Sequence, residues 1–135
     1  MLYVSRLPKV ADLDAFRAEG IRRIVAIKPH DGVVKAWATP GEHYESFDFE
    51  GSPPREAHRK AREIAKVVSD GQRVVVCCEL GQTRSPAFAY LVLRKLGLKG
   101  PEIEREFKKH SLIAIQCPDV AARIKGYKVS KKAHA

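Results

Sequence analysis

The sequence is poor in cysteine and contains no long hydrophobic run. Only three of its 135 residues are cysteines, and two of them, Cys77 and Cys78, are adjacent. An odd number of cysteines with this spacing does not predict the disulfide framework of a small secreted domain. The longest apolar run is AFAYLVL at 87–93, far shorter than the roughly 18 residues of a membrane helix. We therefore expect no insertion into a membrane.

Targeting and metal-binding signals are lacking as well. The first residues, MLYVSRLPKV, show no basic head followed by an apolar stretch, so they do not resemble a secretory signal. The histidines are scattered and no C-x-x-C or H-x-x-x-H pair is present, which argues against a zinc site. These absences predict a cytoplasmic protein with reduced thiols and with no metal or other cofactor.

Acidic residues are few relative to basic ones. The chain has 25 Lys and Arg against 16 Asp and Glu, a formal net charge of +9. Residues 51–135 contain 18 of the basic and 8 of the acidic side chains, so the excess lies in the second part. This balance favours an anionic partner, such as a phosphoprotein, a nucleotide, a nucleic acid or an acidic membrane surface, without selecting one. A solvated basic face would give the same balance.

The length and composition predict one globular domain. A chain of this size can bury a single core, and 44% hydrophobic with 30% charged residues is ordinary for a soluble protein. We find no internal repeat. We expect the domain to occupy residues 1–127, followed by a basic, flexible tail at 128–135.

Strand and helix signals alternate along the chain. This alternation favours an α/β fold, a single domain with a mainly parallel central sheet of about four to five strands flanked by helices. The predicted strands are 2–5, 21–28, 43–49 and 73–78. The predicted helices are one capped by Asp12 that ends at Gly20, one opened by Pro53 and Pro54 that runs to Val68, one over 86–96, and two shorter ones that begin near Pro101 and Pro118.

Two neighbouring segments have the patterns of buried elements. The run RVVVCC at 73–78 is apolar from Val74 to Cys78, which is typical of a central strand covered on both faces. The helix predicted over 86–96 is apolar nearly all round and should also be buried. Because ligands in such folds bind beyond the carboxyl ends of the strands, the loop between these segments is the candidate site.

The loop after Cys78 has the residues of an anion-binding site. A tight turn between a strand and a helix directs backbone N–H groups inward, and the helix adds its positive end. Gly81 gives the turn backbone freedom, and the planar Arg84 guanidinium can hold two oxygens of a phosphate. We therefore predict that the phosphate-binding residues are Glu79, Leu80, Gly81, Gln82, Thr83 and Arg84.

An anion held by this loop would lie above the sulfur of Cys78. The inward N–H groups, the helix N-terminus and Arg84 all favour a thiolate there. A thiolate below a phosphoryl group can attack it and form a cysteinyl-phosphate. Ser85 is placed to donate a hydrogen bond to the sulfur and to ease its departure. Cys77 extends the apolar strand, so we expect it to be a buried core residue.

These residues carry a resemblance to a known family. Cys78-Glu79-Leu80-Gly81-Gln82-Thr83-Arg84-Ser85, or C-x-x-G-x-x-R-S, resembles the signature loop of cysteine-based protein phosphatases, and the size is similar to that of the single-domain dual-specificity type. The opening LYVSRLPKVADLDAFRAEGIRRIVAI is similar to the family's strand–helix–strand entry. Cys77 stands where the family usually has His, and Glu79 adds a negative charge to the loop.

The resemblance implies an enzyme that hydrolyses phosphate monoesters on proteins. The substrate would be a phosphotyrosine protein or peptide, with phosphoserine and phosphothreonine as further possibilities. Phosphate-like oxyanions would inhibit the enzyme. The resemblance implies no cofactor, and we expect the chain to act as a monomer.

The family also uses a general acid, an Asp about thirty residues upstream of the nucleophile and followed closely by Pro. Asp48 lies thirty residues before Cys78 and begins the segment DFEGSPP. Asp48 would protonate the leaving oxygen and later activate a water molecule, with Gln82 as a candidate to orient that water. Glu50 is the second candidate for the acid and Asp31 the third.

Two other functions stay open. A phosphatase for RNA 5′ ends or for phosphoinositides would suit the basic second part, but the loop has no lysine. The chain also lacks the interleaved basic and aromatic residues of RNA-binding proteins, so nucleic acid is not the expected partner. A phosphate-binding module without turnover would require loss of the cysteine, the arginine or the acid, and all three are present.

Overall fold

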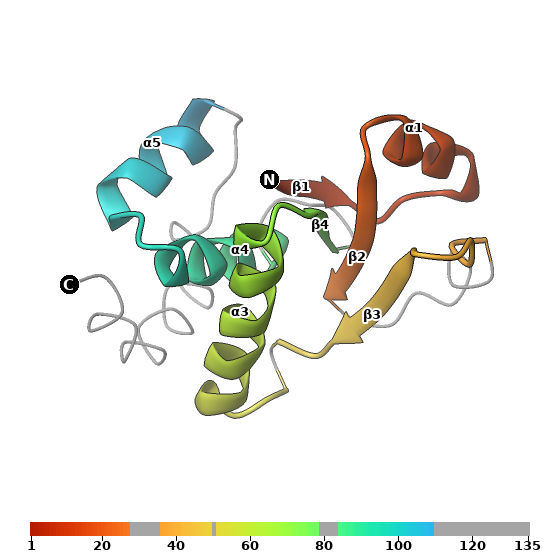
Figure 1. Cartoon of the computed structure of the whole chain (residues 1–135). Helices are drawn as coiled ribbons and strands as arrows, with labels where there is room; N and C mark the ends of the chain where they lie inside the picture. Colours follow the sequence, from red (N-terminus) through yellow and green to blue (C-terminus); the bar gives the residue numbers. More distant parts are fainter. Residues whose placement is uncertain (28–35, 50, 79–83, 110–135) are drawn as a thin grey trace.

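Four parallel strands form one sheet in the order β1-β4-β2-β3. The computed structural model describes residues 1–27, 36–49, 51–78 and 84–109 (Figure 1). The predicted α/β fold with a parallel sheet is confirmed. The strands are β1 (Leu2–Arg6), β2 (Ile21–Ile27), β3 (His43–Phe47) and β4 (Arg73–Cys78), and the helices are η1 (Val10–Asp12), α1 (Leu13–Ala18), α3 (Pro54–Ser69), α4 (Arg84–Lys95) and α5 (Gly100–Lys109).

The sheet has a hydrophobic core on each face. In β4, Val74, Val76 and Cys78 join the cluster that includes α3 and α4, whereas Val75 and Cys77 join the cluster on the α1 side. This division follows from the alternation of side chains along a strand. The prediction that 73–78 is a central strand covered on both faces is therefore confirmed, and Figure 1 shows α1 apart from the helices α3, α4 and α5.

Helices α3 and α4 pack against each other over the sheet. α3 begins at Pro54, as predicted, because proline suits the first turn of a helix. Its apolar residues Ala57, Ala61, Ile64 and Ala65 are buried, and so is His58. In α4, Phe88 packs against Phe47 and Phe49, with ring centroids 5.4 and 5.9 Å away. α5 contributes Ile103 and Phe107 to a third cluster with α4.

The structure differs from the sequence prediction at two element ends. The Asp12 carboxylate accepts the Lys9 N–H at 2.8 Å, so it caps η1 and makes no side-chain bond to α1. The third strand ends at Phe47 rather than at Phe49, because the Phe49 N–H turns back to the Phe47 carbonyl. The helix predicted near Pro118 and the tail predicted at 128–135 lie outside the described residues.

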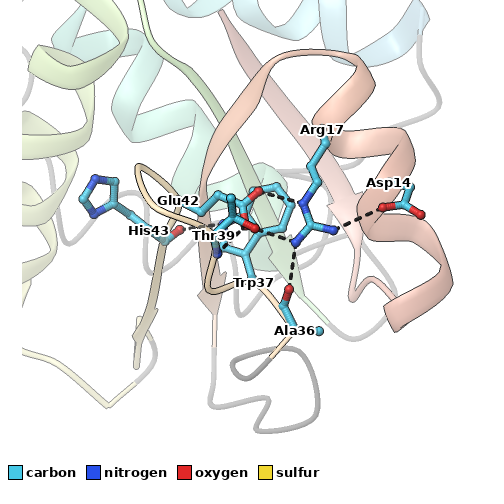
Figure 2. Close-up of polar contacts among 7 residues, drawn as sticks. All are labelled: Asp14, Arg17, Ala36, Trp37, Thr39, Glu42 and His43. Carbon is cyan, nitrogen blue, oxygen red and sulfur yellow. Dashed lines mark hydrogen bonds and ion pairs between the residues drawn. The ribbon is translucent and has the colours of Figure 1, made fainter.

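A partly buried ion pair ties the segment before β3 to α1 (Figure 2). The Glu42 carboxylate has no exposed surface and accepts hydrogen bonds from Arg17 Nε at 2.8 Å and Nη2 at 3.1 Å. The same guanidinium donates to the Ala36 carbonyl at 2.7 Å and lies 5.0 Å from the centre of the Trp37 ring. The indole N–H in turn donates to the His43 carbonyl at 3.1 Å. These contacts hold the entry of β3 in place.

Replacement of Glu42 by Gln is expected to lower the Tm at pH 7 by about 5 °C. The Arg17 hydrogen bond is the main cause that lowers the pKa of Glu42 below its ordinary value of 4.5. A lowered pKa in the folded state adds stability above the unfolded value, and this stability is lost as the pH falls through the folded value. The difference between Glu42→Gln and the wild type should therefore shrink toward about pH 3.

Thermal unfolding between about pH 3 and pH 7, followed by circular dichroism, measures this effect. Glu63→Gln is the matched control, because Glu63 is half-exposed and its pair with Lys60 is 3.5 Å long. An exposed pair of this kind contributes little, so the control should change the Tm by less than about 2 °C. Equal stability of Glu42→Gln and wild type at pH 7 would refute the role of the ion pair.

Candidate active site

The candidate site lies at the carboxyl end of the central strand, where α4 begins. Cys78 is the last residue of β4, Arg84 is the first residue of α4 and Ser85 is the second. The side chains of Cys78 and Ser85 are buried. The predicted loop residues Glu79, Leu80, Gly81, Gln82 and Thr83 lie outside the described residues, and Arg84 is placed here only by its position in α4.

Ser85 makes two contacts with the sulfur of Cys78. Its backbone N–H donates to Sγ at 3.3 Å, and its hydroxyl oxygen lies 3.2 Å from Sγ, with either atom able to donate. The Ser85 hydroxyl can also donate to the Ser5 carbonyl at 3.5 Å. The hydroxyl can thus serve both forms of the sulfur: it accepts the S–H of a thiol while donating to Ser5, or it donates to a thiolate.

The first turn of α4 faces the same sulfur. α4 has 12 residues, and the Ser85 amide that reaches Sγ is one of the N–H groups left without a carbonyl partner at a helix N-terminus. These groups carry the positive end of the helix dipole, which favours an anion. The arrangement therefore suits a thiolate at Cys78 and a bound anion next to it.

The neighbouring Cys77 has a different environment. Its side chain is fully buried on the α1 face, with Sγ 3.7 Å from the Val25 carbonyl. Burial, with a smaller contribution from the charge of Cys78, raises the pKa of Cys77 to about 12. Cys77 is therefore a neutral thiol near pH 7, and the prediction that it is a buried core residue is confirmed.

Asp48 follows β3 at the same edge of the sheet. Its side chain is exposed, and Oδ1 accepts the Gly51 N–H at 2.9 Å. The Asp48 carbonyl accepts the Ser52 hydroxyl at 2.6 Å, so the residue organises a tight turn. A Cβ atom added at Gly51 would lie only 2.1 Å from Oδ2, so a larger residue there would displace the Asp48 carboxylate.

The structure brings Asp48 to the edge that carries Cys78, but not into contact with the sulfur. β2 lies between β3 and β4, so the two strands that deliver these residues are about 10 Å apart. Within the described residues, the Asp48 carboxylate is bonded to Gly51 and not to Cys78. The other candidates for the acid, Glu50 and Asp31, lie outside the described residues.

Two contributors to the site were not predicted from the sequence. The Ser5 carbonyl bonds the Ser85 hydroxyl, and no side-chain signal could have shown this because a backbone group makes the contact. Gly51 bonds Asp48, and its place between Asp48 and the two prolines was the available signal.

The part of the chain that the structure describes contains neither a candidate metal cluster nor a membrane-spanning helix. No group of three or more His, Cys, Asp or Glu side chains there could hold a metal ion. None of the helices described is both long enough and apolar enough to cross a membrane.

A parallel sheet whose central strand brings a cysteine to the N-terminus of a buried helix is the fold of the cysteine-based tyrosine and dual-specificity phosphatases. TpbA of P. aeruginosa superimposes with a TM-score of 0.75 over 99% of this chain and 86% of its own, at 16% identity. PTPMT1 gives a TM-score of 0.77 over 98% and 92%, at 18% identity. Human DUSP28 gives 0.76 over 99% and 95%, at 15% identity.

No family model and no curated protein matches the sequence. At identities of this level the comparisons show the fold alone. The resemblance to cysteine-based phosphatases is thereby confirmed at the level of the fold.

Proposed function

We propose that the protein hydrolyses phosphate monoesters on proteins, with phosphotyrosine as its main substrate, through a cysteinyl-phosphate. The observation that carries this proposal is the convergence of both Ser85 donors on the Cys78 sulfur at the start of α4. A structural cysteine needs no such donors, whereas a nucleophilic thiolate is stabilised by them.

In the first step, Arg84 and the backbone N–H groups of the loop hold the phosphate oxygens. The Cys78 thiolate attacks phosphorus and forms an S–P bond, while the P–O bond to the substrate breaks. The leaving oxygen takes the electron pair of that bond and receives a proton from Asp48.

In the second step, water attacks the phosphorus of the cysteinyl-phosphate. Asp48, now ionised, takes a proton from that water, and the S–P bond breaks with its electron pair returning to Cys78. Ser85 favours this departure because its N–H and its hydroxyl can both donate to the thiolate that forms. Both steps use only water and side chains of this chain.

Asp48 must release the Gly51 N–H to reach the leaving oxygen. The observed bond to Gly51 is a single 2.9 Å contact of an exposed side chain, so its loss costs little. Catalytic groups often take their working positions only when substrate binds. We therefore propose that the turn 48–52 rearranges around the bound substrate.

Two related structures bear on the substrate class. A cysteine-to-serine variant of TpbA was crystallised with pTyr, and it superimposes with a TM-score of 0.74 at 14% identity. PTPMT1 was crystallised with PI(5)P, with a TM-score of 0.72 at 16% identity. A phosphoinositide is thus the second candidate substrate, favoured by the excess of basic residues in 51–135.

Turnover of four substrates tests the proposal. p-Nitrophenyl phosphate, a phosphotyrosine peptide, a phosphothreonine peptide and vesicles that contain PI(5)P should be compared by phosphate release. The proposal expects the largest kcat/KM on the phosphotyrosine peptide among the three biological substrates. A preference for PI(5)P would contradict the proposal and indicate a phosphoinositide phosphatase. No turnover of any substrate would indicate a phosphate-binding module without catalytic activity.

Replacement of Ser85 by Ala is expected to lower kcat by about tenfold to a hundredfold. The variant loses the hydroxyl donor but keeps the backbone N–H, so the thiolate becomes a poorer leaving group in the second step. Stopped-flow measurement with p-nitrophenyl phosphate should then show a burst of p-nitrophenol, because the cysteinyl-phosphate accumulates.

Ser5→Ala is the matched control for Ser85→Ala. The Ser5 hydroxyl donates to the Arg6 carbonyl, and only the Ser5 backbone carbonyl contacts Ser85. The control therefore keeps the contact between the Ser5 carbonyl and the Ser85 hydroxyl, and its kcat should stay within about twofold of wild type. A Ser85→Ala variant with the same kcat as this control would exclude a role for the hydroxyl in turnover.

A further inference from the structure

A basic hollow lies between the last turns of α3 and α4, which pack side by side (Figure 1). Its volume is about 280 Å³, and three of its six lining side chains are cationic. Arg62 and Lys66 come from α3 and Lys95 comes from the end of α4. The remaining lining residues are Ala65, Ser69 and Leu96.

The hollow is separate from the candidate active site. Ser85 lies at the start of α4 and Lys95 at its end, which places them about 15 Å apart along the helix at the rise of an α-helix. An anion in the hollow would therefore not contact Cys78. The inference that follows does not depend on the proposed phosphatase activity.

The side chains of the three cations of the hollow have no bonding partner among the described residues. In residues 1–27, 36–49, 51–78 and 84–109, no ion pair or hydrogen bond of their side chains is found. Nearby basic residues differ in this respect. Lys60 pairs with Glu45 and Glu63, and the Arg94 guanidinium lies 5.8 Å from the centre of the Tyr90 ring.

The carbonyl groups at the two helix ends do not require these cations either. Basic side chains often bind the last carbonyls of a helix, which would give Lys66 and Lys95 a structural role. Here backbone N–H groups of the following turns already bond those carbonyls, at 2.9 to 3.3 Å. The bonded carbonyls are those of Lys66, Val67 and Val68 in α3 and of Val92, Leu93 and Arg94 in α4.

The pKa of Lys95 is lowered by the position of its side chain in the hollow. Burial lowers the pKa of Lys95, and the positive charge of Arg62 lowers it further. Lys95 is partly buried and Arg62 is exposed, and the repulsion between their charges is relieved when an anion lies between them. Among the described residues that line the hollow, the three cations alone carry charge, so none of these residues supplies a negative charge.

We propose that this hollow binds a compact anion with two or more phosphate groups. Three cations match the several negative charges of such an anion, and the Arg62 guanidinium can hold two oxygens of one phosphate while Lys66 and Lys95 act as point charges on the other. The Ser69 hydroxyl can donate to a further oxygen. A volume of about 280 Å³ is small for a drug-sized ligand but large enough for a condensed phosphate.

Titration of the ¹⁵N-labelled full chain with sodium tripolyphosphate, followed by amide chemical shifts, tests the proposal. Saturable shifts are expected at Ser69 and Leu96, separate from any shifts near Ser85. Orthophosphate should bind the hollow about tenfold more weakly or worse, because it cannot reach all three cations. The pKa of Lys95 should rise when tripolyphosphate binds.

The double variant Arg62→Gln/Lys95→Gln should raise the Kd of tripolyphosphate at the hollow by about tenfold or more. The matched control is Arg59→Gln/Arg105→Gln, which removes the same charge from exposed positions outside the hollow. The control should raise this Kd by less than about threefold. Three results would overturn the proposal: shifts confined to the surroundings of Cys78 and Ser85, equal losses in both double variants, or orthophosphate binding as tightly as tripolyphosphate.

Discussion

Replacement of Cys78 by serine is expected to lower phosphatase turnover by about four orders of magnitude or more. A serine hydroxyl is not ionised near neutral pH and cannot form the cysteinyl-phosphate. The Ser85 N–H and the N-terminus of α4 would remain, so phosphate or vanadate should still bind. Turnover of p-nitrophenyl phosphate and isothermal titration with vanadate measure the two effects separately.

Cys77→Ser is the matched control, because it makes the same chemical change one residue away. Cys77 lies on the opposite face of β4, and a serine there can still donate to the Val25 carbonyl. We expect the control to lose some stability but to keep kcat within about threefold of wild type. Equal loss of turnover in both variants would mean that the assignment of the attacking thiol is wrong.

Most elements of the fold could be predicted because their signals are local. The apolar run 74–78 predicts a buried central strand and the proline pair at 53–54 predicts a helix start, and β4 and α3 bear out both predictions. The Arg17–Glu42 pair was not predictable. Its partners are 25 residues apart, and neither the polar side chains nor the lone Trp37 forms a periodic pattern. The burial of Trp37 depends on contacts with α1 and β2, which are distant from it in the sequence.

The candidate site was predictable to different degrees for its different parts. Cys78 and Ser85 lie on either side of one short loop, so the spacing of the motif already implies that they meet. Asp48 comes from another strand, and its position along the chain indicates only the edge of the sheet where it lies. The orientation of its carboxylate depends on the turn made with Gly51 and Ser52, which no spacing rule describes.

Replacement of Asp48 by Asn is expected to lower kcat on a phosphotyrosine peptide by about a hundredfold to ten-thousandfold. Asn keeps a side-chain oxygen that can accept the Gly51 N–H, so the turn should survive while the proton donor is lost. The loss should be smaller on p-nitrophenyl phosphate, because p-nitrophenolate leaves without a proton.

Two further variants distinguish the role of Asp48 from the roles of Glu50 and Gly51. Glu50→Gln removes the other carboxylate of the segment and should leave the dependence on the leaving group unchanged. Gly51→Ala adds a Cβ atom that would lie only 2.1 Å from the present position of Asp48 Oδ2. The Asp48 carboxylate must therefore move, although the carboxylic acid itself is kept. Gly51→Ala should therefore change kcat but keep the wild-type dependence on the leaving group, which Asp48→Asn alters. If Glu50→Gln shows the dependence on the leaving group and Asp48→Asn does not, the general acid is Glu50.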